Sequence, residues 1–269
     1  MIVSATVATF EHRKTLSLAA KKLWTLITKG RVPIIVFGPG GVGKTTLGHF
    51  LETPEERLLA MAKYDRSVET EEFNLGGPVV ARVFVPPGQE FRRELTWPHL
   101  YTMLAQEKRA LVVNVVSDGY HVLNLEPALL SELTNPGAKR KEILEAFLAR
   151  GREKELAVVR AVTDHICKIE SRVSMITVVT KQDLWWEHRD QVQKHYEHGT
   201  YNRCVESILQ AKGAQGFHHE FVSVSLVANN LCTDSGEVVF PTARGYDENI
   251  QVAHQHKLMA TLFALIKAI

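Results

Sequence analysis

The amino-acid sequence predicts a doubly wound α/β fold, a three-layer sandwich in which helices cover both faces of a mostly parallel sheet. Two patterns predict it. Short, nearly unbroken apolar runs recur along the chain, as expected for strands that are buried on both faces of a sheet. Between them lie longer stretches with apolar residues three and four positions apart, the spacing of helices that pack on one side. The 269 residues suffice for one such domain with additions.

Five apolar runs are the expected strands of the parallel sheet: residues 32–37, 78–85, 111–117, 175–180 and 220–225. The second run stops at a Pro-Pro-Gly turn, because proline cannot continue a ladder of backbone hydrogen bonds. Helices are expected at residues 44–51, 89–108, 139–170, 185–210 and 249–269. Residues 235–241 are expected to form a small excursion before the last helix.

The expected domain boundary lies between residues 31 and 32. Residues 1–31 carry an amphipathic helical pattern that stops at Lys29-Gly30, and we interpret them as an N-terminal helical extension. We interpret residues 32–269 as one domain with an enlarged helical segment at 124–172. The pattern leaves open whether the N-terminal helix packs on the edge of the sheet or binds a partner.

Composition argues against several classes of protein. Lys and Arg total 32 against 30 Asp and Glu, so net charge gives no argument for a nucleic-acid or acidic-membrane partner. No segment approaches the roughly 20 consecutive apolar residues of a membrane span, and the N-terminus has the reverse order of a secretory signal. Cys167, Cys204 and Cys232 match no zinc or redox pattern. A cytoplasmic protein with reduced thiols is expected, and a homo-oligomer is left open.

A glycine-rich loop follows the first apolar run and fills every fixed position of G-x-x-x-x-G-K-[ST], the Walker A pattern. Glycines allow such a loop to turn its backbone N–H groups inward around a polyphosphate, which a Cβ would obstruct. The helix that begins near Lys44 adds its positive end to the same anion. Lys44 is expected to reach the terminal phosphates and the Thr45 hydroxyl to ligate Mg²⁺. The residues expected to contact the nucleotide are Gly38, Gly40, Gly41, Val42, Gly43, Lys44, Thr45 and Thr46. The sequence therefore predicts a P-loop NTPase fold, in which this segment binds phosphate, rather than a glycine-rich turn with a solvated lysine.

A second motif indicates which base is bound. Thr180-Lys181-Gln182-Asp183 follows directly after a buried apolar run, at the edge of the sheet where a base could rest. A carboxylate accepts two hydrogen bonds, and guanine offers N1–H and an exocyclic amine on one edge, whereas adenine offers no such pair. The stem of Lys181 can lie over the purine face. Asp183 is therefore expected to select guanine.

On these two motifs the sequence resembles the Ras-like small GTPase superfamily, in which N/T-K-x-D is the guanine motif. Four further elements occur in the family's order, one of which is residues 111–118, similar to the strand after the second switch. Residues 64–73 are similar to the first switch, with Ser67 at the position of a Mg²⁺-binding threonine, and residues 85–91 are similar to the second switch. Ser225 and Leu226, in the stretch Ser-Val-Ser-Leu, resemble the loop beside the guanine ring. The Pro-Gly-Gln element of the second switch also gives a weaker resemblance to bacterial gliding-motility and cell-polarity GTPases.

The resemblance implies that the protein hydrolyses GTP to GDP and phosphate and acts as a nucleotide-dependent conformational switch. Gln89 would then orient the attacking water, the Gly88 N–H would contact the γ-phosphate, and Lys44 would stabilise charge on the transferring group. Slow intrinsic hydrolysis is expected, because such proteins usually take an arginine from a partner. The resemblance also implies GTP or GDP and Mg²⁺ as cofactors and a protein effector or regulator as partner.

One departure from the family leaves alternatives open. Val85 stands where the family usually has an aspartate that holds Mg²⁺ through water, so Thr45, Ser67 and the phosphates, or Asp118, would have to serve as ligands. Asp118 ends a hydrophobic run in the manner of a Walker B carboxylate. The alternatives are a guanine-nucleotide-binding interaction module with little hydrolysis and an ATP-using P-loop protein in which Asp118 is the Walker B group.

Overall fold

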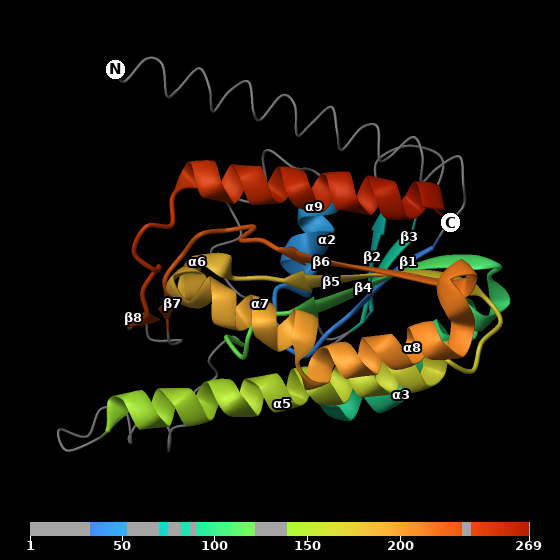
Figure 1. The fold of residues 1–269 in the computed structure, drawn as a ribbon, viewed down its shortest axis with the longest axis horizontal. Helices are drawn as coiled ribbons and strands as arrows, with labels where there is room; N and C mark the ends of the chain where they lie inside the picture. The colour runs from blue at the N-terminus through green and yellow to red at the C-terminus, as the bar shows by residue number, and fades with distance from the viewer. Residues whose placement is uncertain are drawn as a thin grey trace, which may run out of the picture.

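The computed structural model (Figure 1) describes residues 33–52, 70–74, 82–86, 90–121, 139–232 and 238–268. The predicted N-terminal extension, Ser67, Gly88 and Gln89 lie outside these residues. The predicted domain boundary and the enlarged segment at 124–172 stay predictions.

Six strands form the main sheet in the order β2-β3-β1-β4-β5-β6. Their bounds are β1 Ile34–Phe37, β2 Glu71–Asn74, β3 Arg82–Val85, β4 Arg109–Val116, β5 Arg172–Val179 and β6 Phe217–Ser223. In this sheet, as far as the structure describes it, the pairs β1–β3, β1–β4, β4–β5 and β5–β6 are parallel, and the edge strand β2 pairs antiparallel with β3. The predicted α/β class with a mostly parallel sheet is thus confirmed.

The central strand β1 shows why its sequence is apolar throughout. Ile34 and Val36 belong to the buried cluster on one face of the sheet, and Ile35 and Phe37 belong to the cluster on the other face. All four residues are at most 1% exposed. Because side chains alternate between the two faces of a strand, a strand covered on both faces needs an apolar residue at every position.

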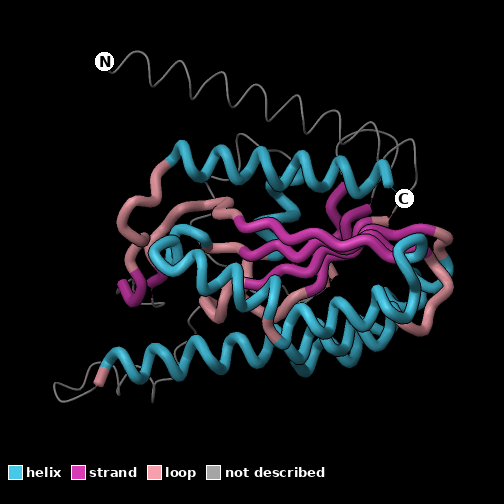
Figure 2. The backbone as a smooth tube through the Cα atoms, in the orientation of Figure 1, coloured by secondary structure: helices cyan, strands magenta, loops and turns pink. Residues whose placement is uncertain are grey.

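Helices cover both faces of the sheet (Figures 1 and 2). On one face lie α2 (Lys44–Glu52) and α9 (Glu248–Ala268), whose apolar side chains share a core cluster with the strands. The second core cluster joins the other face to α3 (Glu90–Gln106), α5 (Arg140–Ile166), α6 (Gln182–Trp185), α7 (Arg189–His198) and α8 (Thr200–Gly216). These two clusters complete the predicted three layers.

The structure differs from the sequence-based expectation in three places. The helix expected at residues 185–210 is divided into η2 (Trp186–His188), α7 and α8, with an extended backbone at Gly199 between the last two. Strand β8 (Val238–Phe240) lies within the expected excursion and pairs antiparallel with β7 (Leu231–Cys232), which lies before it. Strand β2 was not expected, because four residues at the sheet edge with two glutamates do not form an apolar run.

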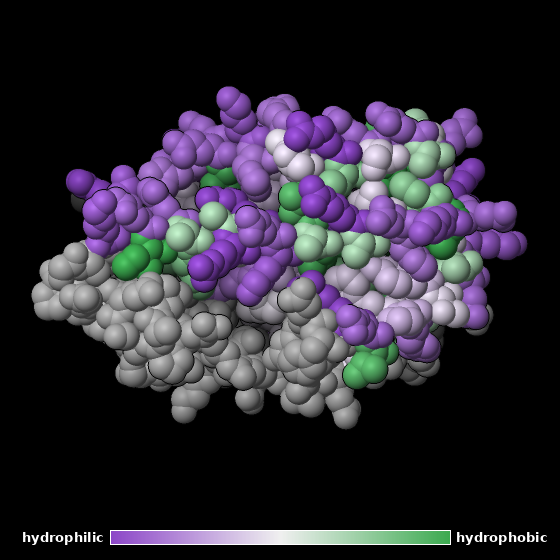
Figure 3. Space-filling view, turned by 90° about the horizontal axis from the view of Figure 1, so that it is seen from below, coloured by the Kyte–Doolittle hydropathy of each residue, from purple (hydrophilic) through white to green (hydrophobic). Residues whose placement is uncertain are grey.

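The side of the molecule seen in Figure 3 is mainly hydrophilic, with hydrophobic residues scattered among polar ones. Leu95 is the most exposed large hydrophobic side chain of the described part, at 81%. Among the described helices, none is both long enough and apolar enough to cross a membrane.

The sheet topology brings the predicted motifs to one edge. The glycine-rich loop follows β1, residues 117–121 follow β4, Thr180 to Asp183 follow β5, and Ser225 follows β6. The carboxyl ends of parallel strands meet at the same edge, and chain segments on either side of a central strand open a crevice there. The edge beyond β1, β4, β5 and β6 is therefore where a ligand would bind.

Candidate functional site

The glycine-rich loop between β1 and α2 has the backbone that its glycines were expected to allow. Gly38, Gly41 and Gly43 have φ angles of +148°, +80° and +93°, which residues with a Cβ rarely adopt. At Gly38 space is also lacking, because a Cβ would lie 2.4 Å from the Val115 carbonyl oxygen. Helix α2 begins at Lys44, and its first N–H groups have no partner within the helix. The loop and the helix start together form a site suited to an anion.

Lys44 lies over its own loop. Its side chain belongs to a residue that is 7% exposed, and Nζ donates to the carbonyl oxygen of Pro39 at 2.8 Å. Burial, with a smaller contribution from the charge of Arg93, lowers the pKa of Lys44 to about 7, and Glu71 opposes the shift. If a phosphate bound here, its negatively charged oxygen would replace the neutral Pro39 carbonyl oxygen as the acceptor of the Lys44 ammonium. Thr45 and Thr46 follow in the first turn of α2 and are half-buried.

The first two residues of Thr180-Lys181-Gln182-Asp183 bind the glycine-rich loop. The Thr180 hydroxyl donates to the carbonyl oxygens of Val42 at 2.6 Å and Val116 at 3.0 Å. Lys181 Nζ donates to the Gly41 carbonyl oxygen at 2.8 Å and also to that of Tyr120. Lys181 has a left-handed backbone, with a φ of +56°.

Burial lowers the pKa of Lys181 to about 7, although the charges of Asp183 and Glu155 oppose this shift. The ammonium thus depends on two neutral carbonyls rather than on a carboxylate in direct contact. The second motif therefore joins three segments: the glycine-rich loop, the end of β4 and the end of β5.

Asp183 is held in place by two protein donors. The carboxyl group belongs to a residue that is 1% exposed; Oδ1 accepts from the Ser225 hydroxyl, and Oδ2 accepts from the Asn229 backbone N–H at 3.1 Å. Burial raises its pKa, and these two hydrogen bonds and Lys181 oppose the shift. A carboxylate has about four acceptor positions, more than the protein donors occupy, so it can also accept from a guanine edge.

Leu226 is fixed beside this carboxylate by the last helix. Its carbonyl oxygen accepts from the side-chain amides of Gln251 at 3.1 Å and Gln255 at 3.2 Å, both in α9. Ser225 is fully buried, and its carbonyl oxygen accepts from Gln255 at 3.2 Å. The structure thus brings Ser225 and Leu226 to the same end of the site as Asp183.

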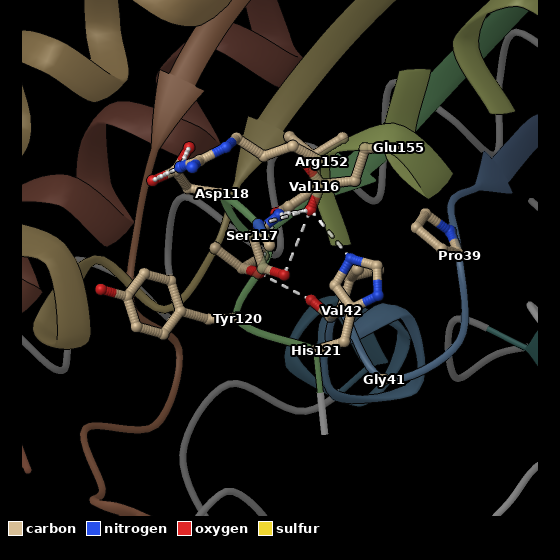
Figure 4. Close-up of polar contacts among 12 residues, drawn as sticks. Pro39, Gly41, Val42, Val116, Ser117, Asp118, Tyr120, His121, Arg152 and Glu155 are labelled. Atoms are coloured by element: carbon tan, nitrogen blue, oxygen red, sulfur yellow. Dashed lines mark hydrogen bonds and ion pairs between the residues drawn. The ribbon is translucent and has the colours of Figure 1, made fainter. Parts of the chain in front are cut away.

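Asp118 follows β4, but its carboxylate is paired with Arg152 of α5. Its two carboxylate oxygens lie 3.4 and 3.3 Å from Arg152 Nη1 in α5. Figure 4 shows this carboxylate pointing to Arg152, on the side away from Pro39 and Gly41 of the glycine-rich loop. Burial raises the pKa of Asp118 to about 7, and Arg152 opposes the shift. The metal role of Asp118 stays a prediction, and its carboxylate would have to leave Arg152 to meet a cation at the loop.

Within the described residues, no group of three or more His, Cys, Asp or Glu side chains could hold a metal ion. Thr45, one of the predicted metal ligands, follows Lys44 in the first turn of α2. Ser67, Gly88 and Gln89, predicted for the metal and the hydrolysis step, belong to the undescribed stretches. Thus the structure brings together the phosphate-binding and base-binding candidates.

A buried glutamate that sequence reasoning missed lies next to this site. Glu155 in α5 is 1% exposed, and its Oε1 lies 3.0 Å from His121 Nε2 (Figure 4). Oε2 accepts from the Tyr196 hydroxyl at 2.6 Å. Burial alone would raise the pKa of Glu155, but the hydrogen bond and charge of His121 and the bonds from Tyr196 and Ser117 lower it. The sequence signal was present: Glu155 interrupts the apolar stripe that continues through Val159 and Val162.

Comparisons with known proteins give matches among solved structures and no family. No protein-family model matches the chain, and no curated protein matches it either. Among solved structures, the chain is similar to the crystal structure of an ADP-ribosylation factor-like GTP-binding protein, the small COPII coat GTPase SAR1 from Encephalitozoon cuniculi in complex with GDP. The two share 14% identity over 99% of this chain and 91% of the other, with a TM-score of 0.44. A function for this chain must therefore be argued from its own site.

Proposed function

We propose that this protein binds guanine nucleotides, hydrolyses GTP slowly to GDP and phosphate, and acts as a nucleotide-dependent switch. One observation carries the proposal: the predicted base motif is bonded directly to the predicted phosphate loop. The two hydrogen bonds, from Thr180 to Val42 and from Lys181 to Gly41, join residues 138 and 140 positions apart. A chance occurrence of Thr-Lys-Gln-Asp would have no reason to meet the glycine-rich loop in this way.

The residues at the site divide into two groups by the ligand chemistry they suit. The N–H groups of the glycine-rich loop and of the start of α2, together with the Lys44 ammonium, suit a polyphosphate. Asp183, oriented by Ser225 and Asn229, suits the N1–H and amine edge of guanine. The side chain of Lys181 lies between these two groups because it bonds the loop and follows β5. A nucleotide would satisfy both groups at once.

Thr45, with Ser67 from the predicted first switch, would hold Mg²⁺ beside the phosphates. Bound Mg²⁺ would supply positive charge next to the transferring phosphoryl group. The hydroxyl of Thr45 fits this role, because Mg²⁺ prefers oxygen ligands and keeps several waters and phosphate oxygens in its shell.

Gln89 would orient the water that attacks the γ-phosphate, and the Gly88 N–H would contact that phosphate. Strand β3 supports this placement, because it ends at Val85 and pairs with β1, whose residue Ile35 lies opposite Phe84. Loss of the γ-phosphate would then release both switches, so that hydrolysis becomes a conformational signal for a protein effector or regulator.

A guanine-nucleotide-binding module with little hydrolysis is the second candidate. Val85 favours it, since this residue is fully buried at the end of β3 and cannot bind a cation. An ATP-using protein receives less support, because its proposed Walker B group, Asp118, is paired with Arg152.

The test of guanine binding is a titration of the purified protein with fluorescent GDP, followed by displacement with GDP, GTP and ATP, with and without Mg²⁺. We expect GDP and GTP to displace the label at concentrations about a hundredfold lower than ATP does, because adenine cannot pair with Asp183. Displacement by ATP at equal or lower concentration would overturn the role of Asp183 and return Asp118 to consideration.

Single-turnover hydrolysis of GTP then separates the two guanine-binding candidates. In a switch that hydrolyses GTP, Gln89→Leu should slow phosphate release about tenfold or more while the affinity for GTP stays the same. A wild-type protein that binds GTP without releasing phosphate would be the interaction module instead.

A further inference from the structure

We propose that Glu155 is a positioning residue of the guanine-nucleotide site. It holds the loop after β4, and this loop carries the carbonyl that anchors Lys181, so Glu155 sets how slowly bound nucleotide leaves. The inference rests on the proposed function. It concerns a residue of α5 that belongs to neither nucleotide motif.

Three successive backbone amides at the end of β4 are bonded to side chains from the helical layer. The N–H groups of Ser117 and Gly119 donate to Glu155 Oε1 at 2.9 and 3.1 Å. The N–H of Asp118 between them donates to the Tyr196 hydroxyl oxygen at 2.9 Å, and that hydroxyl donates to Glu155 Oε2. A buried amide that loses its acceptor is costly. This carboxylate therefore determines the conformation of the loop.

The loop also lies directly on α5, with no side chain between the two backbones. A Cβ at Gly151 would come within 2.5 Å of the Gly119 Cα, and a Cβ at Gly119 within 2.2 Å of the Leu148 carbonyl oxygen. Gly119 has a φ of +82°, which other residues rarely adopt. A change in how α5 holds this loop must therefore move the backbone that follows Gly119.

The next residue passes this constraint to the nucleotide site. The Tyr120 carbonyl oxygen accepts a hydrogen bond from Lys181 Nζ, and the same Nζ donates to the Gly41 carbonyl oxygen of the glycine-rich loop. The connection runs from the Glu155 carboxylate through the loop backbone to Lys181 and then to the phosphate-binding backbone. Without Glu155 the loop amides lose their acceptors, the Tyr120 carbonyl shifts, and Lys181 keeps only one of its two anchors.

The test is a double-mutant cycle on the dissociation of fluorescent GDP, chased with excess unlabelled GDP. The variants are Glu155→Gln, Lys181→Met and the double variant. Methionine keeps an apolar stem over the purine and removes the ammonium. Glutamine has one acceptor oxygen where Glu155 has two, so either the loop amides or the Tyr196 hydroxyl loses its acceptor. We expect Glu155→Gln to raise the dissociation rate constant about tenfold in the wild-type background and less than about twofold in the Lys181→Met background.

The matched control is Thr163→Val, which removes another buried polar contact of α5. Thr163 is 5% exposed, and its hydroxyl donates to the Cys204 carbonyl oxygen at 3.3 Å, away from the loop after β4. This variant should unfold at a lower temperature and keep a GDP dissociation rate constant within about twofold of wild type. A purely structural role of Glu155 would give the same pattern as this control.

Tyr196→Phe provides a second route if Glu155→Gln does not fold. It keeps the buried ring and removes the hydroxyl shared by Glu155 and Asp118, so dissociation should accelerate about threefold, again only when Lys181 is present. Equal acceleration with and without the Lys181 ammonium, or an unchanged rate, would overturn the inference alone. Failure of the wild-type protein to retain labelled GDP would overturn the proposed function together with it.

Discussion

Two lysines, one from each motif of the site, make similar hydrogen bonds, but the sequence separation between each lysine and its acceptors differs. Lys44 and Lys181 each donate to a backbone carbonyl of the glycine-rich loop, of Pro39 and Gly41 respectively. Burial lowers the pKa of each to about 7. The bond of Lys44 spans five residues, whereas those of Lys181 span 140 and 61.

This difference separates a ligand-binding lysine from one that builds the site. A phosphate oxygen can replace the Pro39 carbonyl at Lys44 without disturbing any distant segment. If the carbonyls at Lys181 were lost, the glycine-rich loop, the end of β4 and the end of β5 would no longer be joined. We therefore expect changes at the phosphate end to abolish binding outright and changes at the base end to alter selectivity and lifetime.

Lys44→Ala tests the phosphate end and should have the largest effect. Removing the ammonium leaves phosphate charge without its buried partner, so affinity for fluorescent GDP should fall about a thousandfold or more. Lys141→Ala is the matched control, because Lys141 is an exposed lysine of α5 paired with Glu145 at 3.9 Å. Retained micromolar binding by Lys44→Ala would mean that the glycine-rich loop is not the site.

Asp183→Asn tests the base end. An amide donates one hydrogen bond where the carboxylate accepted two, so GDP should bind about a hundredfold more weakly and xanthosine diphosphate more tightly. Competition between the two diphosphates for the fluorescent label measures this change. An unchanged order of the two bases would separate Asp183 from base recognition and leave only the phosphate end in place.

The pKa of Lys44 gives a pH dependence with a defined sign. Above pH 7 this lysine is mostly neutral in the free protein, while bound phosphates favour its charged form. Affinity for GDP should therefore fall by up to about tenfold per pH unit above pH 7, and the effect should disappear below it. Calorimetric titrations at pH 8, in buffers of different ionisation enthalpy, should show uptake of about one proton per GDP, whereas none would contradict the assignment.

The same lysine affects the stability of the nucleotide-free protein in the opposite direction. The unfolded chain keeps this lysine protonated up to about pH 10.5, its ordinary value, while the folded chain releases the proton near 7. The unfolded state thus binds more protons between these pH values, so the contribution of Lys44 to the free energy of unfolding rises with pH across this window. Bound nucleotide should remove that rise.

Thr180→Val should give the smallest effect. Valine has nearly the shape of threonine but cannot donate to the carbonyl oxygens of Val42 and Val116, and one lost hydrogen bond costs about 1 kcal/mol. GDP affinity should fall about fivefold while the preference for guanine over adenine stays intact. A loss of base preference in this variant would show that Thr180 orients the base itself.

Much of the fold and both motifs could be predicted because their signals are local. The residues of β1 are apolar at every position since both faces are covered, and the glycine-rich loop needs glycine where φ is positive. Strand β2 could not be predicted, because an edge strand with two glutamates forms only through its pairing with β3. The pairing of Asp118 with Arg152 and the contacts of Glu155 depend on how α5 packs, which sequence spacing does not determine.

The parallel order of the strands has a practical consequence at the opposite edge of the sheet. The connections that lead into β4, β5 and β6 lie there, tied by contacts such as Ser171 Oγ to the Leu104 carbonyl oxygen and Lys212 Nζ to that of Ile169. A Cβ at Gly213 in this region would meet nothing within 4 Å, although the φ of +68° favours glycine at that position. A fluorophore or an immobilisation tag attached at this edge would leave the nucleotide-facing loops untouched, so exchange could be followed on single molecules.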